Sequence, residues 1–173
     1  MTVPRSPDVI EPDQAAAIFA ELAAAGDLAL RFPADGCYAR THLMVLRLLE
    51  QGLLPLKLWA FAASPTDLLW TETLDHPDGR VRWGYHVAPV LVVHGTDGDT
   101  SEMVFDPILF DRPAAVEEWR RALHDTPTLV RTAPGEPPLP ESGGSGNWPG
   151  PDPLEGPDVH AREALEEYER SNA

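Results

Sequence analysis

The chain has a single cysteine, Cys37, among 173 residues, so no disulfide can form within it. A scaffold held together by disulfides is therefore excluded, and a free thiol is typical of a reducing compartment. No apolar run approaches the roughly 20 residues that cross a bilayer. The N-terminus also lacks the basic and apolar regions of a signal peptide. These absences predict a soluble, cytoplasmic protein that does not bind membranes, with non-classical export left open.

Basic residues are also scarce. The chain has 13 Lys and Arg against 28 Asp and Glu, which gives a net charge of -15. Nucleic acids are not expected as partners, because binding phosphates requires a basic surface. Neutral or basic substrates approach such a protein more easily. No second cysteine and no HExxH pair suggests a metal, and we expect no cofactor. The sequence leaves the oligomeric state open.

The composition divides the chain into three parts. A length of 173 residues is enough for one domain with its own core, which we place at residues 1–125. Residues 126–157 are rich in Pro, Gly and Ser, which predicts a flexible segment. Residues 158–173 form an acidic tail in which 158–170 favour a short helix.

Within the first part, the spacing of apolar residues predicts an α+β domain. Helical periodicity covers residues 13–25, 37–51 and 111–125, while β patterns cover 54–62, 81–95 and 101–106. Turn signals at 75–79 and 95–99 separate the β segments, so adjacent strands are expected to run antiparallel. Asp35 or Gly36 is expected to cap the helix that starts at Cys37.

Cys37 opens that helix within the stretch DGCYARTH. The N-terminal end of a helix favours negative charge, and the thiolate is the nucleophilic form of a cysteine. A free cysteine in a globular protein is nevertheless more often a small buried hydrophobe. Position alone therefore leaves both interpretations open, and the decision depends on whether a histidine and an acid reach the thiol.

His86 is the histidine that fits this requirement best. His42 lies five residues beyond Cys37, on a different face of the helix, and the remaining four lie in turns or near helix ends. His86 sits inside the apolar run WGYHVAP, and pairing about the 95–99 turn opposes it to Asp106 or Pro107. Asp106 is thus placed to orient the imidazole. A buried structural histidine is the alternative.

The segments DGCYARTH, WGYHVAP and FDPILF, in this order, resemble the protein glutaminase (protein-glutamine deamidase) family. RFPADGCYAR, LKLWAF and DRPAAVEEW extend the resemblance over roughly residues 28–124. The resemblance implies a papain- and transglutaminase-like fold, with an antiparallel sheet packed against a central helix that carries the cysteine at its N-terminus. It also implies that Cys37 is the nucleophile, His86 the base and acid, and Asp106 the orienting residue.

The implied activity is hydrolysis of glutamine side chains in proteins or peptides, through a thioester and with release of ammonia. Trp83 and Tyr85 flank His86 and are candidates for binding the substrate, while Arg40 is expected to brace the site through a carboxylate. Three alternatives remain. An amine could replace water as acceptor, which would make the enzyme a transglutaminase-like amide synthase. The chain could be a toxin-like deamidase of one specific protein, or an interaction module without catalysis.

Overall fold

The computed structural model describes residues 8–64, 66–73, 75–124, 126–136 and 159–171. Its centre is a six-stranded sheet in the order β7-β6-β5-β2-β8, with β1 pairing in parallel to β5. The strands are β1 Val9–Ile10, β2 Leu56–Phe61, β5 Tyr85–His94, β6 Thr100–Val104, β7 Ala114–Ala115 and β8 Thr128–Thr132. β3 Leu69–Glu72 and β4 Arg80–Trp83 form a separate two-stranded sheet.

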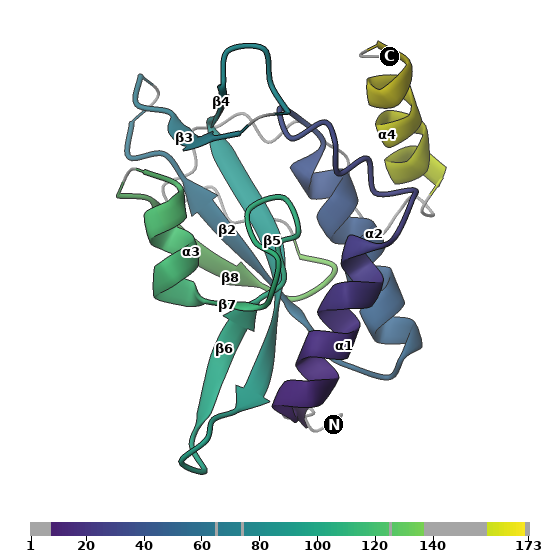
Figure 1. Cartoon of the computed structure of the whole chain (residues 1–173), viewed down its shortest axis with the longest axis vertical. Coiled ribbons are helices and arrows are strands. Elements are labelled where there is room, and N and C mark those ends of the chain that lie inside the picture. Colours follow the sequence, from purple (N-terminus) through teal and green to yellow (C-terminus); the bar gives the residue numbers. More distant parts are fainter. Residues whose placement is uncertain (1–7, 65, 74, 125, 137–158, 172–173) are drawn as a thin grey trace.

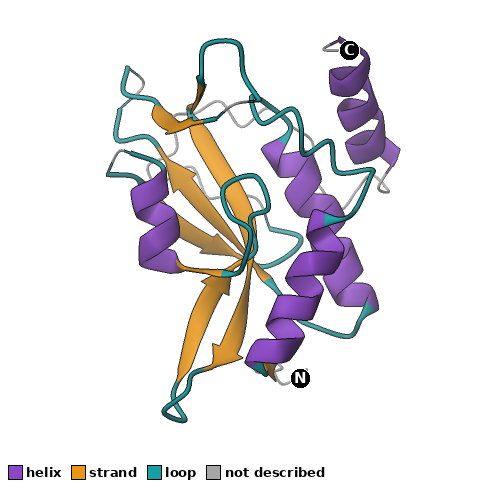
Figure 2. Cartoon of the chain, viewed as in Figure 1, coloured by secondary structure: helices purple, strands orange, loops and turns teal. Residues whose placement is uncertain are grey.

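Helices cover both faces of the large sheet (Figures 1 and 2). α1 Pro12–Ala23 and α2 Cys37–Glu50 lie on one side, together with the C-terminal helix α4 Val159–Ser171. α3 Val116–Ala122 lies on the other side. The structure confirms the α+β architecture, including a helix that begins at Cys37. Among the described residues, none of the helices has both the length and the apolarity to cross a membrane.

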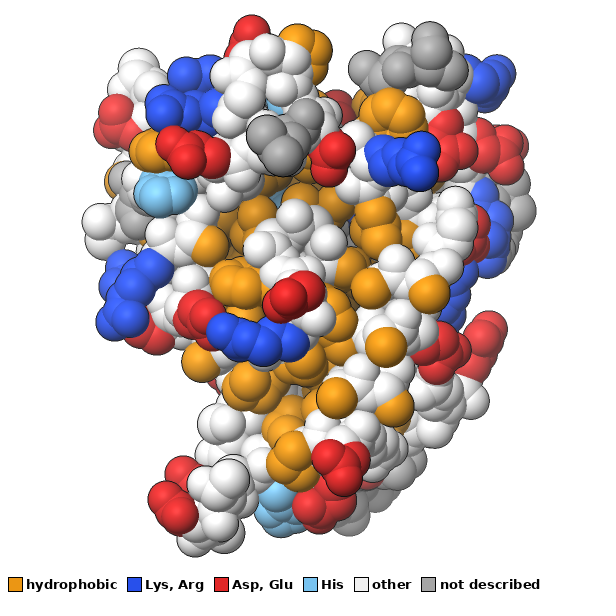
Figure 3. All heavy atoms as spheres, in the orientation of Figure 1, with side chains coloured by type: hydrophobic (Ala, Val, Ile, Leu, Met, Phe, Trp, Pro, Cys, Tyr) orange, Lys and Arg blue, Asp and Glu red, His pale blue; other side chains and the backbone are white. Residues whose placement is uncertain are grey.

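The side chains of β5 alternate between two hydrophobic clusters, one on each face of the sheet. Leu91 and Val93 join the cluster formed with α1, α2 and α4, while Ala88 and Val90 join the cluster formed with α3 and the small sheet. Successive side chains of a strand point to opposite faces, so a run buried on both sides reads as continuously apolar. Figure 3 shows hydrophobic side chains gathered between α3 and α1 on the face in view.

Three expectations from the sequence need correction. The β run predicted over 81–95 is two strands, because the chain breaks at Gly84, whose carbonyl accepts the Ala62 N–H at 3.0 Å. The helix predicted over 111–125 is shorter, at Val116–Ala122, since Ala114 and Ala115 pair with β6 instead. Residues 128–132, assigned to the flexible segment, form β8 against β2. Residues 137–157 of that segment lie outside the described residues.

The β5–β6 register also differs from the expected one. Val90 pairs with Val104 and His94 with Thr100, one residue away from the expected pairing. The ladder ends at Val90, and His86 pairs along the backbone with Ala60 of β2. Backbone pairing therefore does not bring His86 to Asp106, and their contact is made by side chains beyond the end of β6.

The turn before α2 packs closely against α4 at Gly36. Gly36 caps α2 with φ +77°, a left-handed conformation that only glycine adopts readily. A Cβ at this position would lie 2.9 Å from Leu165 and 3.3 Å from Tyr168. Gly36 is thus required both by its backbone angle and by the close approach of the C-terminal helix.

We expect Gly36→Ala to destabilise the protein more than Gly52→Ala does. Gly52 has a similar φ of +81°, but a Cβ added there would meet no atom within 4 Å, so its substitution costs only the left-handed penalty of about 1–2 kcal/mol. Gly36→Ala adds overpacking against α4, about 1 kcal/mol or more. Urea unfolding of both variants measures the difference, and equal losses would show that α4 does not press on this turn.

Candidate active site

Cys37 is the first residue of α2, in a turn held by its neighbours. The Gly36 N–H donates to Asp35 Oδ1 at 2.7 Å, and the Arg40 N–H donates to the Gly36 carbonyl at 3.0 Å. The thiol is free and buried against Trp59, Phe61 and Val87. The first N–H groups of a helix have no helical acceptors, so this position favours a negatively charged group beside the sulfur.

His86 and Asp106 form a buried pair. The His86 Nε2–H donates to Asp106 Oδ2 at 2.8 Å, and both side chains are at most 3% exposed. The Trp119 indole N–H donates to the same oxygen at 2.8 Å, and the Ile108 N–H donates to Oδ1 at 3.1 Å. The imidazole stacks on Trp83 with ring centroids 4.6 Å apart. A carboxylate with three donors and an imidazole held by stacking make a fixed arrangement.

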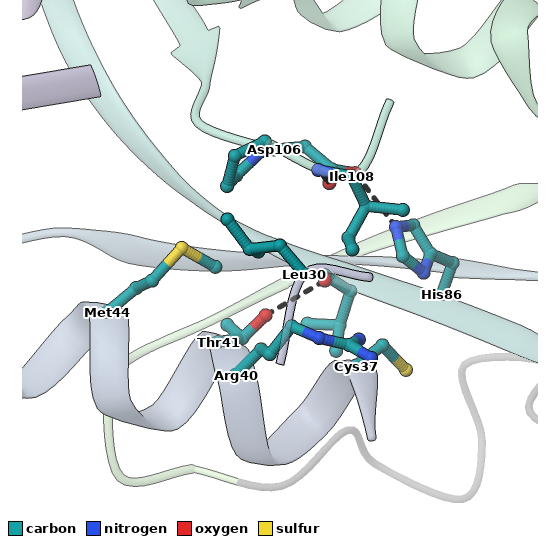
Figure 4. A pocket seen from close by; sticks show the side chains of 10 residues that line it. Leu30, Cys37, Arg40, Thr41, Met44, His86, Asp106 and Ile108 are labelled. Carbon is teal, nitrogen blue, oxygen red and sulfur yellow. Dashed lines mark hydrogen bonds and ion pairs between the residues drawn. The ribbon is translucent and has the colours of Figure 1, made fainter. Parts of the chain in front are cut away.

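Cys37 and His86 line one small cavity at the part of β5 that no longer pairs with β6. Cys37 packs beside Val87 on the α2 side of the sheet, whereas the His86 ring contacts Trp119 of α3. Because pairing with β6 ends at Val90, the edge of β5 is open at His86. There the second ring nitrogen of His86, Nδ1, is turned toward the side on which Cys37 lies, and Nε2 toward Asp106 (Figure 4).

A hydrogen bond fixes the height of α2 above this edge. The Thr41 hydroxyl donates to the Val87 carbonyl at 2.8 Å (Figure 4). Thr41 lies one helical turn beyond Cys37, and Val87 directly follows His86. The bond therefore holds α2 to β5 within one helical turn of Cys37 and next to His86.

The charges at the site are strongly coupled. Burial by itself lowers the pKa of His86, but the charge and hydrogen bond of Asp106 outweigh burial, and Cys37 adds to them, so the pKa rises to about 9. Burial raises the pKa of Asp106, yet His86, Trp119 and the Ile108 N–H hold it below its ordinary value. At neutral pH the pair is an imidazolium and a carboxylate, ready to donate a proton from Nδ1.

Tyrosines surround the thiol on its other side. Burial, together with Asp35 and Cys37, raises the pKa of Tyr38 and of Tyr85. Burial and a hydrogen bond to Asp35 raise the pKa of Tyr168 to about 12. All three hydroxyls are therefore neutral at physiological pH and keep a proton that can be donated in a hydrogen bond. Tyr168 comes from α4, and no pattern in the sequence linked it to Cys37.

Arg40 braces the site, but through backbone carbonyls rather than the expected carboxylate. Its Nη2 donates to the Phe32 carbonyl at 2.6 Å and to the Asp35 carbonyl. Trp83 supports the same turn, because its indole N–H donates to the Pro33 carbonyl at 2.9 Å. The turn that precedes Cys37 is thus held by side chains from α2 and β4.

Cys37, His86 and Asp106 line one small cavity, and their catalytic roles stay a prediction. Trp83, a candidate for substrate binding, is 5% exposed and stacks on His86, and its contact with substrate stays a prediction. Tyr85 is half-buried beside Trp59 and Phe61, and its contact with substrate stays a prediction. The described residues include no group of three or more His, Cys, Asp or Glu that could hold a metal.

Comparisons with known proteins point to the family that the sequence motifs resemble. The sequence pattern of a family described as glutaminase matches residues 15–123. No curated protein matches the chain. A crystal structure of a protein-glutaminase is 24% identical with a TM-score of 0.63, over 76% of each chain. The NMR structure of protein-glutaminase from Chryseobacterium proteolyticum is 20% identical with a TM-score of 0.69, over 94% of this chain and 89% of that one.

A pro-protein-glutaminase crystal structure is 22% identical with a TM-score of 0.64, and the match spans 90% of this chain and 66% of that one. These likenesses show that the fold is the papain- and transglutaminase-like one that the sequence resemblance implied.

We expect the stability difference between the wild type and Asp106→Asn to depend on pH. The pKa of His86 rises from 6.5 to about 9 in the folded protein, so its protonation stabilises the fold fully below about pH 6.5 and ceases to do so as the pH passes about 9. The substitution removes the carboxylate charge that causes this shift. Thermal melting from about pH 6 to about pH 10 should show the difference shrinking. A constant difference would contradict the charged pair.

Proposed function

Because this chain belongs to the protein glutaminase family, we propose that it hydrolyses the side-chain amide of glutamine in proteins or peptides, releasing ammonia and leaving glutamate. The observation that carries the proposal is the buried His86–Asp106 pair beside the thiol of Cys37 at a helix N-terminus. This combination of groups suits acyl transfer through a covalent intermediate.

In the first half of the reaction, the Cys37 thiolate attacks the carbonyl carbon of the glutamine carboxamide. Backbone N–H groups at the start of α2, including that of Cys37, stabilise the resulting oxyanion, and such a donor typically contributes about 3–4 kcal/mol. The imidazolium of His86 donates its Nδ1 proton to the departing nitrogen. Ammonia leaves, the carbon–nitrogen bond is broken, and a thioester to Cys37 remains.

In the second half, water attacks the thioester. Neutral His86 accepts a proton from that water, the carbon–sulfur bond breaks, and glutamate leaves the thiolate behind. Asp106 keeps the Nε2–H of His86 directed at itself, so that Nδ1 is the nitrogen that exchanges protons. The raised pKa of His86, about 9, suits the first proton donation, because the imidazole is charged at neutral pH.

A cavity beside the nucleophile is our candidate for the residues that flank the glutamine. It measures about 420 Å³ and is lined by Phe32, Pro33, Ala34, Asp35, Asp75, His76, Pro77 and Tyr168. This volume lies in the usual range for ligand sites. Asp35 and Tyr168 connect it with Cys37, two residues from Asp35. Its carboxylates come from Asp35 and Asp75, and none of the described residues that line it is a lysine or arginine.

We expect Cys37→Ala and His86→Gln to lower the deamidation of a glutamine peptide at least about a thousandfold, because each removes a group that makes or breaks a bond. Ammonia release and mass spectrometry of glutamine-to-glutamate conversion measure the effect. His94→Gln, at the far end of the same strand, is the matched control and should keep wild-type activity.

A parallel reaction with a primary amine decides the acyl acceptor. Glutamate and ammonia in both reactions support hydrolysis, whereas an amine adduct would make the protein an amide synthase. Full activity of Cys37→Ala would rule out the thioester route.

We also expect a peptide with lysine beside the glutamine to have a lower KM than the same peptide with glutamate there, because of the carboxylates of the cavity. Asp75→Asn should reduce this preference, and Asp97→Asn, in the turn beyond the other end of β5, should leave it unchanged. Steady-state kinetics with both peptides measures the preference. Equal KM values of the wild type for the two peptides would show that the substrate residues beside the glutamine do not bind in this cavity.

A further inference from the structure

We propose that Arg40 is a positioning residue for the nucleophile: its guanidinium fixes the turn before Cys37 and supplies a buried positive charge that favours the thiolate. The proposal rests on the proposed function only in taking Cys37 as the nucleophile. It concerns a group that the reaction steps above do not use.

The first part of the role is the clamp on the turn. Nη2 reaches two carbonyls, those of Phe32 and Asp35, from a side chain that is 2% exposed. Arg40 lies in the first turn of α2, so the bonds tie the start of the helix to the chain that leads into it. The turn ends at Gly36, directly before Cys37. A shift of the turn would therefore move Cys37 relative to His86.

The second part is the charge. A buried cation is costly unless an anion compensates it, and among the described residues no carboxylate forms an ion pair with Arg40. Burial lowers the pKa of the guanidinium, and the groups that oppose this are negative charge at Cys37 first, then at Asp106 and Asp35. Electrostatic coupling is reciprocal, so a cation that is stabilised by the thiolate also stabilises the thiolate.

The remaining donors of Arg40 support this division of roles. Nε and Nη1 are buried and have no hydrogen-bond partner in the part of the chain that the structure describes. Arg40 lines a cavity of about 10 Å³ together with Cys37, His86 and Asp106 (Figure 4). A purely structural arginine would use these donors on backbone acceptors. Here one nitrogen makes the clamp, and the rest of the cation lies among the catalytic groups.

Lysine and methionine substitutions separate the clamp from the charge. Arg40→Lys keeps a cation but loses the planar group that reaches both carbonyls, because an ammonium on a flexible stem has a different geometry. Arg40→Met keeps an unbranched apolar stem and removes both the charge and the donors. Arg47→Met is the matched control, since Arg47 lies on the same helix but pairs with Asp27.

The experiment measures alkylation of Cys37 by iodoacetamide across pH, by mass spectrometry of the intact chain. Because the chain has one cysteine, each adduct reports on Cys37 alone. We expect Arg40→Met to lower the second-order rate constant at neutral pH by about tenfold or more and to move the rise in rate to higher pH. Arg40→Lys should stay within about threefold of wild type, and Arg47→Met should match it.

Thermal melting and steady-state kinetics complete the test. We expect Arg40→Lys to lower kcat with little change in KM, because the clamp positions the thiol without contacting substrate. A wild-type alkylation profile in folded Arg40→Met would overturn the proposal and leave Arg40 a structural residue. If Arg40→Met does not fold, the test rests on Arg40→Lys. A wild-type kcat in Arg40→Lys would refute the clamp. A tenfold lower alkylation rate in Arg40→Lys, which keeps the positive charge, would refute the role of that charge.

The alkylation profile needs no glutamine substrate. If the wild type deamidated nothing but its thiol still depended on Arg40 as expected, the proposed function would fail and the role of Arg40 would stand. If deamidation proceeded and the alkylation rate of Cys37 did not depend on Arg40, the proposed function would stand and the role of Arg40 would fail.

Discussion

The site depends on the burial of one carboxylate. Asp106 is almost fully enclosed, and its charge is stable there only because His86, Trp119 and the Ile108 N–H all donate to it. These donors come from β5, from α3 and from the chain just after β6. The sheet, the helix on its far face and the loop after β6 must therefore all be in place before the imidazole is oriented. Loss of any one of them leaves a buried charge short of a partner.

That constraint explains why β6 is short. If β6 continued to pair with β5 beyond Val90, its backbone would occupy the edge at which His86 faces both Asp106 and the thiol. By leaving the ladder after Val104, the chain frees this edge and turns the Asp106 side chain back toward it. The Thr41–Val87 bond then sets α2 against the same edge from the other face. Cys37, on the α2 side of the sheet, and His86, whose ring contacts α3, therefore line the same small cavity.

The sequence predicted the three catalytic candidates because their signals are local: a cysteine at a helix start, a histidine inside an apolar run, and an aspartate just beyond a hairpin. What it missed depends on backbone acceptors and distant segments. Arg40 was expected to bind a carboxylate, but it donates to backbone carbonyls of the preceding turn. Every residue has such a carbonyl, so the sequence does not indicate which one is bound. β8 was hidden in a proline-rich region, although Thr128–Thr132 pairs with β2 once that strand is in place.

The C-terminal helix α4 completes the surroundings of Cys37. Leu165 and Tyr168 pack against Gly36, Tyr168 bonds to Asp35, and Arg162 pairs with Asp27 at 2.5 Å. Helix α4 thus contacts both ends of the segment that leads to Cys37, at Asp27 and at Asp35–Gly36. Asp27 also pairs with Arg47 of α2. The exposed ion pairs contribute little by themselves. The close fit at Gly36 is therefore what makes the geometry around the thiol depend on a helix more than 120 residues away.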